Sequence, residues 1–336
     1  MHSISNGGDE SAAVARVVFR SHGFVRLQWG SRIESGLFLK SLNPIVGDRV
    51  VIRDPQTVPW VIDRILERTS LLKRRDPGGG KDQELAANVD DVWIVTSANQ
   101  DLNPRRLERL LALVLSSGAR ARLVVTKADL CPNWDDITSM LGSRFQGVPI
   151  HLISSWSGAG VSELEATLQP GLTVTMLGSS GVGKSTLTNR LLGDNRQQTQ
   201  DIRGDDDKGR HTTTSRELFE LPGGAFLIDQ PGLREVRLTD AEDGIEQVFE
   251  DLAELEMRCR FSDCRHQGEP GCAVASAFEA GEFDSDRWDS YQKLKREAEF
   301  ARAREAKTTR LRDKERGRKM SKMLKRLYKD RERGDW

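Results

Sequence analysis

The chain has 336 residues, too many for one ordinary hydrophobic core, so two or three domains are expected. No run approaches the ~20 apolar residues of a transmembrane helix, and residues 1–13 are polar and acidic where a secretion signal would be basic and then apolar. We therefore expect a cytoplasmic protein with no membrane segment, and its 4 cysteines argue against a disulfide framework.

Residues 14–70 are predicted to be all-β. Short β-prone runs, separated by Gly, Asn, Pro and Asp, cover residues 14–19, 24–27, 35–39, 48–52 and 60–65. Five strands within about 55 residues favour a small closed barrel of the oligonucleotide/oligosaccharide-binding (OB) type. We assign this OB-type β-barrel to residues 1–70. The barrel fold alone does not establish nucleic-acid binding, because an inference of function from the fold would rest only on analogy.

Strands and helices alternate after a Gly-rich link at 76–81. Strands are predicted over 92–96, 122–126, 148–153, 172–177 and 224–229, and helices over 104–117, from 162 and over 185–192. This alternation predicts a parallel sheet covered on both faces, an α/β domain assigned to 71–240.

The strand signal ends after residue 240. Helices are expected over 245–255 and 288–329, in a C-terminal helical domain assigned to 241–336. Although Lys/Arg and Asp/Glu balance at 51 each, the last 44 residues carry 18 basic and 8 acidic side chains, a net charge of +10. Such a basic helix is suited to neutralising RNA phosphates rather than to reading bases.

The strongest motif is G-x-x-x-x-G-K-[ST] at 178–185, between a predicted strand and a predicted helix. Glycines let backbone N–H groups surround a phosphate, Lys184 supplies a cation for the β/γ oxygens, and Ser185 offers a hydroxyl to Mg²⁺. The residues expected to bind the nucleotide phosphates are Gly178, Ser179, Ser180, Gly181, Val182, Gly183, Lys184, Ser185 and Thr186.

A guanine-recognition motif of the form N/T-K-x-D is predicted at 126–129, directly after a strand. Asp129 can accept hydrogen bonds from N1–H and the 2-amino group of guanine, which adenine does not offer, so an ATPase is disfavoured. The stem of Lys127 can cover the base, and Thr126 opens the motif. Ser154 and Ser155 match the companion loop that touches the guanine O6.

A third motif, D-x-P-G, covers Asp229 to Gly232 after a predicted buried strand, and is typical of the turn that senses Mg²⁺ and the γ-phosphate. Upstream, Thr213 lies 28 residues after Ser185 and is our candidate for completing the Mg²⁺ coordination. Thr212 and Thr214 remain alternatives.

The position that holds a water-orienting Gln in most GTPases is Leu233, which cannot form a hydrogen bond through its side chain. We therefore expect slow intrinsic hydrolysis. His211, beside the switch threonines, is the candidate catalytic residue, with a solvated loop histidine as the alternative.

The motif order is permuted. In an ordinary GTPase the phosphate loop comes first and the base-recognition loops last, whereas here 126–129 and 154–155 precede 178–185. The chain then leaves the core after the D-x-P-G turn and enters the C-terminal domain, so the nucleotide state could be linked to that domain.

Cys259, Cys264, His266 and Cys272 form C-x₄-C-x-H-x₅-C. Three thiolates and one imidazole suit a closed, tetrahedral and therefore structural Zn²⁺ site. Cys131 lies outside this cluster and is expected to pack as a small apolar side chain.

Together these motifs resemble the small-ribosomal-subunit-dependent GTPase family of the RsgA/YjeQ type, over nearly the whole chain. The segment 86–90 and the residues after Cys272 also resemble that family. The resemblance implies a cytoplasmic GTPase that binds GTP and GDP with Mg²⁺, carries one structural Zn²⁺, and is stimulated by the small ribosomal subunit late in its maturation. We expect a monomer, because a switch that docks on the ribosome has no evident need to dimerise. It also implies rRNA contacts by the barrel and the zinc domain.

Two residues depart from the family pattern. Thr126 stands where the family usually has Asn, whose amide braces the phosphate loop and guanine N7. We expect weaker nucleotide binding because a hydrogen bond would be lost. Gln230 replaces a common Thr, with little effect expected. The alternative function is a GTP-switched, RNA-binding assembly scaffold with negligible turnover.

Overall fold

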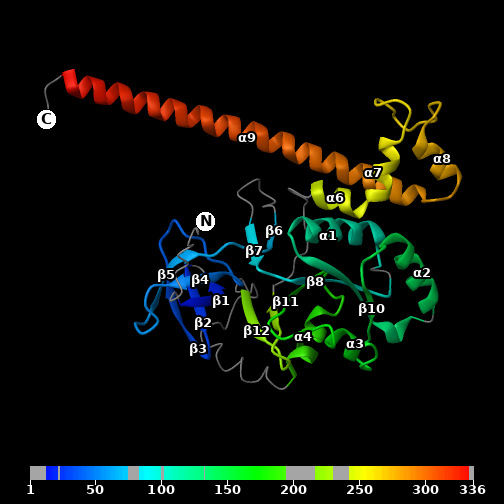
Figure 1. Cartoon of the computed structure of the whole chain (residues 1–336), viewed down its shortest axis with the longest axis horizontal. Helices are drawn as coiled ribbons and strands as arrows, with labels where there is room; N and C mark the ends of the chain where they lie inside the picture. The colour runs from blue at the N-terminus through cyan, green and yellow to red at the C-terminus, as the bar shows by residue number, and fades with distance from the viewer. Residues whose placement is uncertain are drawn as a thin grey trace, which may run out of the picture.

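The computed structural model describes residues 13–21, 23–74, 83–99, 102–131, 133–193, 216–229 and 242–332. A small barrel, an α/β region and a helical region follow one another along the chain (Figure 1). Within these ranges no helix is both long and apolar enough to cross a membrane. The predicted link at 76–81 lies outside the described residues.

The first five strands close into a barrel, as predicted. They are β1 (Val14–Ser21), β2 (Phe24–Trp29), β3 (Arg32–Leu37), β4 (Arg49–Ile52) and β5 (Trp60–Ile65). Their order is β1-β2-β3-β5-β4, and the pairing of β4 with β1 completes the closure. Alternate side chains fill the interior because successive residues of a strand face opposite sides. These are Ala15, Val17, Val25, Leu27, Val50, Ile52, Trp60 and Ile62.

The second region is built on parallel strands. They are β8 (Asp91–Ser97), β9 (Arg120–Thr126), β10 (Ile150–Leu152), β11 (Thr173–Leu177) and β13 (Phe226–Asp229). The order is β10-β9-β8-β11-β13, with every neighbouring pair parallel. The parallel sheet predicted from the alternation of elements is therefore confirmed, and all the carboxyl ends of these strands lie along one edge.

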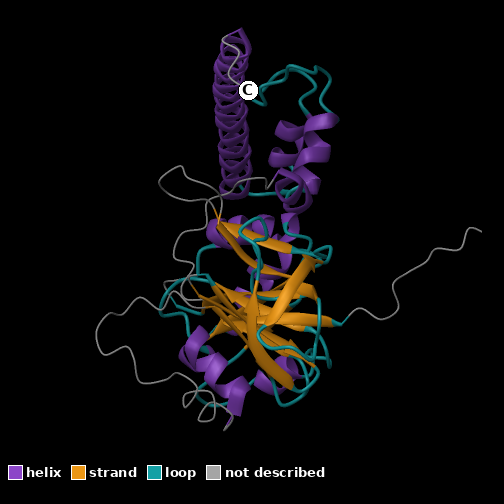
Figure 2. Ribbon diagram, turned by 90° about the vertical axis from the view of Figure 1, so that its left-hand side faces the viewer, coloured by secondary structure: helices purple, strands orange, loops and turns teal. Residues whose placement is uncertain are grey.

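Helices cover both faces of this sheet (Figure 2). Val92 and Ile94 of β8 pack with α1 (Pro104–Ser116) and α2 (Trp134–Arg144), whereas Trp93 and Val95 face α3 (Val161–Glu165) and α4 (Lys184–Leu192). Because both faces are buried, the middle of β8, residues 92–95, is a continuous apolar run with no alternation in its sequence.

Several elements were not predicted. They are α2, the hairpin of β6 (Leu71–Arg74) and β7 (Gln83–Ala87), β12 (Arg216–Glu220) and α8 (Ala273–Glu279). The apolar signal is weak in two of these elements: α2 has one buried residue, Leu141, and β12 has only two. The strand β3 also begins three residues earlier than the predicted run at 35–39.

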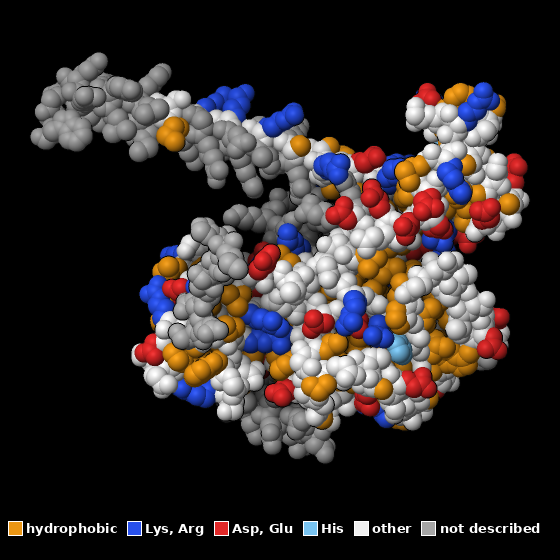
Figure 3. All heavy atoms as spheres, in the orientation of Figure 1, with side chains coloured by type: hydrophobic (Ala, Val, Ile, Leu, Met, Phe, Trp, Pro, Cys, Tyr) orange, Lys and Arg blue, Asp and Glu red, His pale blue; other side chains and the backbone are white. Residues whose placement is uncertain are grey.

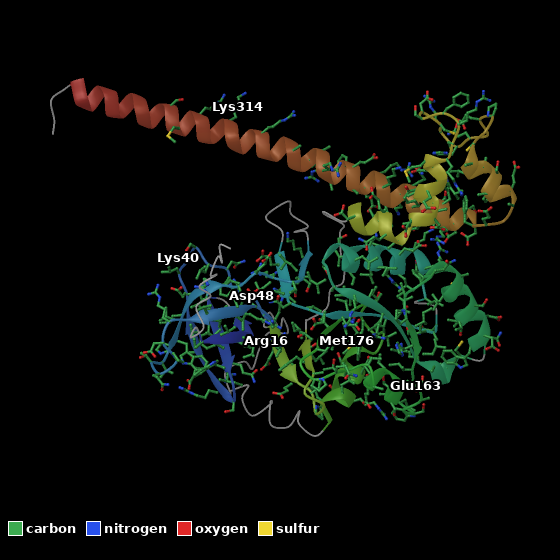
Figure 4. All side chains as sticks on the ribbon, viewed as in Figure 1. Arg16, Lys40, Asp48, Glu163, Met176 and Lys314 are labelled. Atoms are coloured by element: carbon green, nitrogen blue, oxygen red, sulfur yellow. The ribbon has the colours of Figure 1, made fainter. Side chains whose placement is uncertain are left out.

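The barrel and the parallel sheet are joined by hydrogen bonds. β12 pairs antiparallel with β13 on one side and with β1 on the other, so one sheet of 11 strands runs through both regions. Arg16 of β1 lies at this junction (Figure 4): it donates to the Thr173 hydroxyl and stacks 4.7 Å from the centre of the Phe226 ring. Burial, and then the neighbouring Arg49, lower the pKa of Arg16 to about 10, which leaves it charged at neutral pH.

The C-terminal region contains α6 (Glu242–Val248), α7 (Glu250–Met257), α8 and α9 (Ser285–Glu332). α6 packs closely on α1, where Gly244 lies against the backbone of Ala112. The 48 residues of α9 form one continuous helix that extends past the body of the molecule (Figure 1). Exposed basic side chains lie along the described middle of this helix (Figure 3), and they are Arg302, Arg304, Arg310, Lys314 and Arg318.

Replacing Gly244 with Ala is expected to destabilise the contact between α6 and α1. A Cβ there would lie 2.0 Å from the Ala112 carbonyl oxygen, so the helices must separate, at a cost of about 1–3 kcal/mol. Denaturant unfolding measures the loss. Gly142→Ala in α2 is the control, since a Cβ there meets nothing within 4 Å, and it should be neutral or slightly stabilising. Equal effects of the two changes would contradict this packing argument.

Candidate nucleotide site and metal centre

The phosphate-binding motif lies between buried strand β11 and helix α4. Gly178, Gly181 and Gly183 have φ angles of 154°, 82° and 97°, which favour glycine. A Cβ on Gly178 would lie 2.1 Å from the Val95 carbonyl oxygen. The loop therefore passes too close to β8 for any side chain at Gly178, and it delivers the chain to the N-terminus of α4, where backbone N–H groups favour an anion.

Two side chains of α4 have the positions that the motif requires. The Lys184 ammonium donates to the carbonyl oxygens of Gly178 and Ser179 at 2.7 and 2.5 Å, so its charge lies over the loop. Ser185 is exposed in the first turn of α4, where its hydroxyl could take part in Mg²⁺ coordination, and the adjacent Thr186 is exposed too.

The base-recognition motif follows β9. Lys127 adopts a left-handed conformation with φ 58°, and a 3₁₀ turn (Ala128–Leu130) presents Asp129. The hydroxyl of the buried Ser154 donates to Asp129 Oδ1 at 2.5 Å, and the Ser157 N–H donates to the Ser154 hydroxyl. One carboxylate oxygen of Asp129 is thus held by the protein.

The backbone of Ser155, the second serine of this loop, accepts a hydrogen bond from helix α4. Arg190 in α4 donates to the Ser155 carbonyl oxygen at 3.2 Å. Sequence reasoning did not single out Arg190, because nothing in its local pattern relates it to a loop 35 residues earlier. The two serines predicted as companions of the base motif do lie beside it.

Thr126 joins the base side to the phosphate side. Its hydroxyl lies 2.5 Å from the Val182 carbonyl oxygen and 3.1 Å from that of Thr96. Thr at this position therefore keeps a hydrogen bond to the phosphate loop, whereas the weaker nucleotide binding expected from the lost contact with guanine N7 stays a prediction. A hydroxyl reaches the loop directly, because β9 and the loop approach closely at Gly183, where a Cβ would meet Thr126 Oγ1 at 3.6 Å.

Asp229, at the end of β13, lies at the same carboxyl edge as the loops that follow β9 and β11. His211, Thr213 and Gly232 lie outside the described residues, as do Thr212, Thr214, Gln230 and Leu233. The described geometry therefore brings together the phosphate and base motifs, and their order along the chain is the permuted one.

The four predicted metal ligands form one cluster beside this α/β region. One potential ligand atom from each of Cys259, Cys264, His266 and Cys272 lies within 4.8 Å of the others. Nδ1 of His266 is 3.5 Å from Cys259 Sγ and 3.6 Å from Cys272 Sγ, so this nitrogen faces the thiols. Three sulfur atoms and one imidazole match the donor set of a structural zinc site. Cys131 lies outside the cluster, as expected, and is half-buried.

A phosphate loop that follows its base-recognition loop in the chain, on a parallel sheet beside a small barrel, defines a circularly permuted P-loop GTPase. The model of the RsgA GTPase family matches residues 65–239, and the chain belongs to that family. An ABC transporter model also matches residues 161–327, a range that contains the phosphate loop.

Individual relatives agree with this assignment. "Small ribosomal subunit biogenesis GTPase RsgA" of Methanosarcina acetivorans is 44% identical over 288 residues, which cover 85% of this chain and 78% of that protein. RsgA 2 of Vibrio parahaemolyticus is 45% identical over 259 residues, 77% of this chain and 71% of that protein.

Two solved structures have the same fold. The crystal structure of YjeQ from Thermotoga maritima has a TM-score of 0.63 at 28% identity, covering 84% of this chain and 96% of that one. YloQ, described as a circularly permuted GTPase, has a TM-score of 0.63 at 23% identity, covering 90% and 99%.

Removing the Thr126 hydroxyl tests its bracing of the phosphate loop. Thr126→Val keeps the shape but leaves the buried Val182 carbonyl without this donor. A lost hydrogen bond of about 0.5–1.5 kcal/mol corresponds to roughly 2- to 10-fold weaker GDP binding. Thr126→Ser retains the hydroxyl and should bind GDP nearly as well as the original chain. Calorimetric titration measures both, and equal affinities for the Val and Ser variants would contradict the bracing role.

Proposed function

We propose that this protein hydrolyses GTP to GDP and phosphate when stimulated by the small ribosomal subunit, and that it acts late in maturation of that subunit. The observation that carries the proposal is the convergence of the base and phosphate loops, which the contact between Thr126 and Val182 joins. The relatives named small ribosomal subunit biogenesis GTPase support the choice of partner.

Each part of the site has a proposed role. Asp129 would accept from N1–H and the 2-amino group of guanine, held ready by Ser154. Ser155 would offer its backbone to O6, and Lys127 would cover the base with its stem. The phosphate loop would surround the β-phosphate, and Lys184 would turn from the loop carbonyls towards the β/γ oxygens.

Hydrolysis requires residues that hold Mg²⁺ beside the phosphates and a residue that positions the attacking water at the γ-phosphate. Ser185 and Thr213 would hold Mg²⁺, with Asp229 and Gly232 in the adjoining turn, and the ion would supply positive charge against the negative charge that develops on the phosphates. His211 is proposed to position the attacking water, because Leu233 has no group that can do so. Slow turnover without the ribosomal subunit is expected from this arrangement.

The remaining parts of the chain are proposed to bind ribosomal RNA. We divide the chain into an OB-type barrel (1–70), a permuted GTPase domain (71–240) and a zinc-binding helical domain (241–336). The basic face of α9 would neutralise phosphates. One structural Zn²⁺ would be held by Cys259, Cys264, His266 and Cys272. We further propose that the protein acts as a monomer in the cytoplasm.

A second function is favoured by one observation. Leu233 lacks the hydrogen-bonding group of a water-positioning Gln, so the protein could act as an RNA-binding assembly scaffold that GTP switches with negligible turnover. Stimulation by the subunit separates these two functions.

GTP turnover is expected to rise strongly when stoichiometric small ribosomal subunits are added to the purified protein. Phosphate release with GTP, compared with ATP and with large subunits, measures this stimulation and its specificity. Tight GTP binding without any stimulation would instead support the scaffold function.

The His211→Ala variant is expected to hydrolyse GTP more slowly than the original chain when the small ribosomal subunit is present. An unchanged stimulated rate would remove His211 from the mechanism.

Asp129→Asn is expected to shift nucleotide preference from GTP to XTP. An amide can donate to the 2-oxo group of xanthine, where a carboxylate accepts from the 2-amino group of guanine. Competition binding with both nucleotides measures the shift, and Asp136→Asn, on the exposed side of α2, is the matched control. If GTP selectivity survived in the Asp129 variant, the assignment of base recognition would be wrong.

A further inference from the structure

The carboxylate of Glu256 occupies a position between the metal cluster and the long helix. Glu256 lies in the last turn of α7, three residues before Cys259, and is half-buried. Its two oxygens contact a metal-ligand histidine on one side and three side chains of α9 on the other. The nucleotide site uses none of these groups.

On the metal side, His266 Nε2 lies 3.6 Å from Glu256 Oε1. The other ring nitrogen, Nδ1, faces the sulfur atoms of Cys259 and Cys272. A metal ion held at Nδ1 fixes the proton on Nε2, so the loaded imidazole directs an N–H towards the carboxylate. Carboxylates in this position orient a ligand imidazole and raise its basicity.

On the helix side, Glu256 accepts three hydrogen bonds from the first turns of α9. Tyr291 and Lys295 donate to Oε2 at 2.8 and 2.6 Å, and Gln292 donates to Oε1 at 3.1 Å. Burial acts to raise the pKa of Glu256, but hydrogen bonds from Lys295 and Tyr291 prevail and hold it below its usual value.

The same turns of α9 are attached to the GTPase region on the opposite side. Ser290 donates to the buried Glu108 of α1, and Arg109 of α1 makes a bidentate pair with Glu297 at 2.6 and 2.9 Å. The start of α9 is thus held between α1 and the metal cluster. The rest of α9 continues beyond these contacts, so a small change in these turns would swing the basic end widely.

We propose that Glu256 is a positioning residue that couples metal occupancy to the docking of α9. Loading the cluster directs the His266 N–H at Glu256, which in turn fixes Tyr291 and Lys295. Because coupling between two binding equilibria is reciprocal, docking of α9 must also tighten metal binding. This inference rests on the metal-binding part of the proposed function and is independent of GTP hydrolysis.

The first test measures zinc affinity of the full-length chain by competition with a chromophoric chelator. Glu256→Gln keeps the shape but removes the charge that faces His266 and Lys295, and we expect about 10- to 100-fold weaker zinc binding. Glu254→Gln, an exposed residue of the same helix, is the control and should bind zinc as the original chain does. Equal affinities for the two variants would overturn the proposal.

The second test asks whether a contact on α9 changes the zinc affinity of the cluster. Lys295→Met removes a partner of Glu256 on α9 that is no candidate metal ligand, and we expect zinc affinity to fall at least 3-fold. Lys293→Met, an exposed neighbour, should leave it unchanged. A purely local role for Glu256 in the metal shell predicts no effect of either lysine, so an unchanged affinity in Lys295→Met would overturn the coupling.

The third measurement is hydrogen exchange of the amides at 288–298. Zinc removal from the original chain should speed their exchange, and the Glu256→Gln chain should exchange fast with or without zinc. Protection that does not depend on zinc would overturn the coupling while leaving the zinc site intact. A chain that binds no zinc would overturn the proposed metal as well, so the two failures can be told apart.

Discussion

The nucleotide site depends on one constraint: parallel strands place their carboxyl ends along a single edge. β9 and β11 both flank β8, so the base loop after Thr126 and the phosphate loop after Leu177 emerge side by side. The Thr126 hydroxyl donates to the Val182 carbonyl oxygen, which lies 56 residues later in the sequence. Permuting the chain changes the order of the motifs but leaves this sheet edge unaltered, which is why the site survives.

The permutation also places the C-terminal helices directly after the nucleotide-binding motifs in the chain. Residues 242–248 form α6, which packs on α1 with Gly244 in contact with the backbone of Ala112. Helix α1 in turn connects β8 to β9, the strand that leads into the base motif. The C-terminal helices are therefore attached to the helix that precedes β9, and β9 leads into the base motif.

Much of this arrangement could be predicted from local sequence patterns. The phosphate loop has glycines where the backbone needs positive φ, and the metal cluster lies within 14 residues of sequence. Both signals are local, so a single sequence contains them. The barrel strands and the buried strand β8 were likewise recognisable from their β-prone residues and their length.

Long-range pairing could not be predicted in the same way. The contact between β1 and β12 joins residues about 200 positions apart, and hydrogen bonds between backbones leave no residue signature. The contact between the Thr126 hydroxyl and the phosphate loop was not foreseen, because the distance between β9 and this loop is a property of the packed sheet. The partners of Glu256 were invisible for the same reason: three of them lie on a helix that begins 29 residues later.

The most direct test of the central claim is a nucleotide footprint by hydrogen exchange. With GDP and Mg²⁺, we expect protection to appear together at 178–187, 126–130 and 153–157, at the same nucleotide concentration, and ADP should not reproduce it. Protection confined to 178–187, or equal protection by ADP, would contradict the claim that these loops form one guanine-nucleotide site.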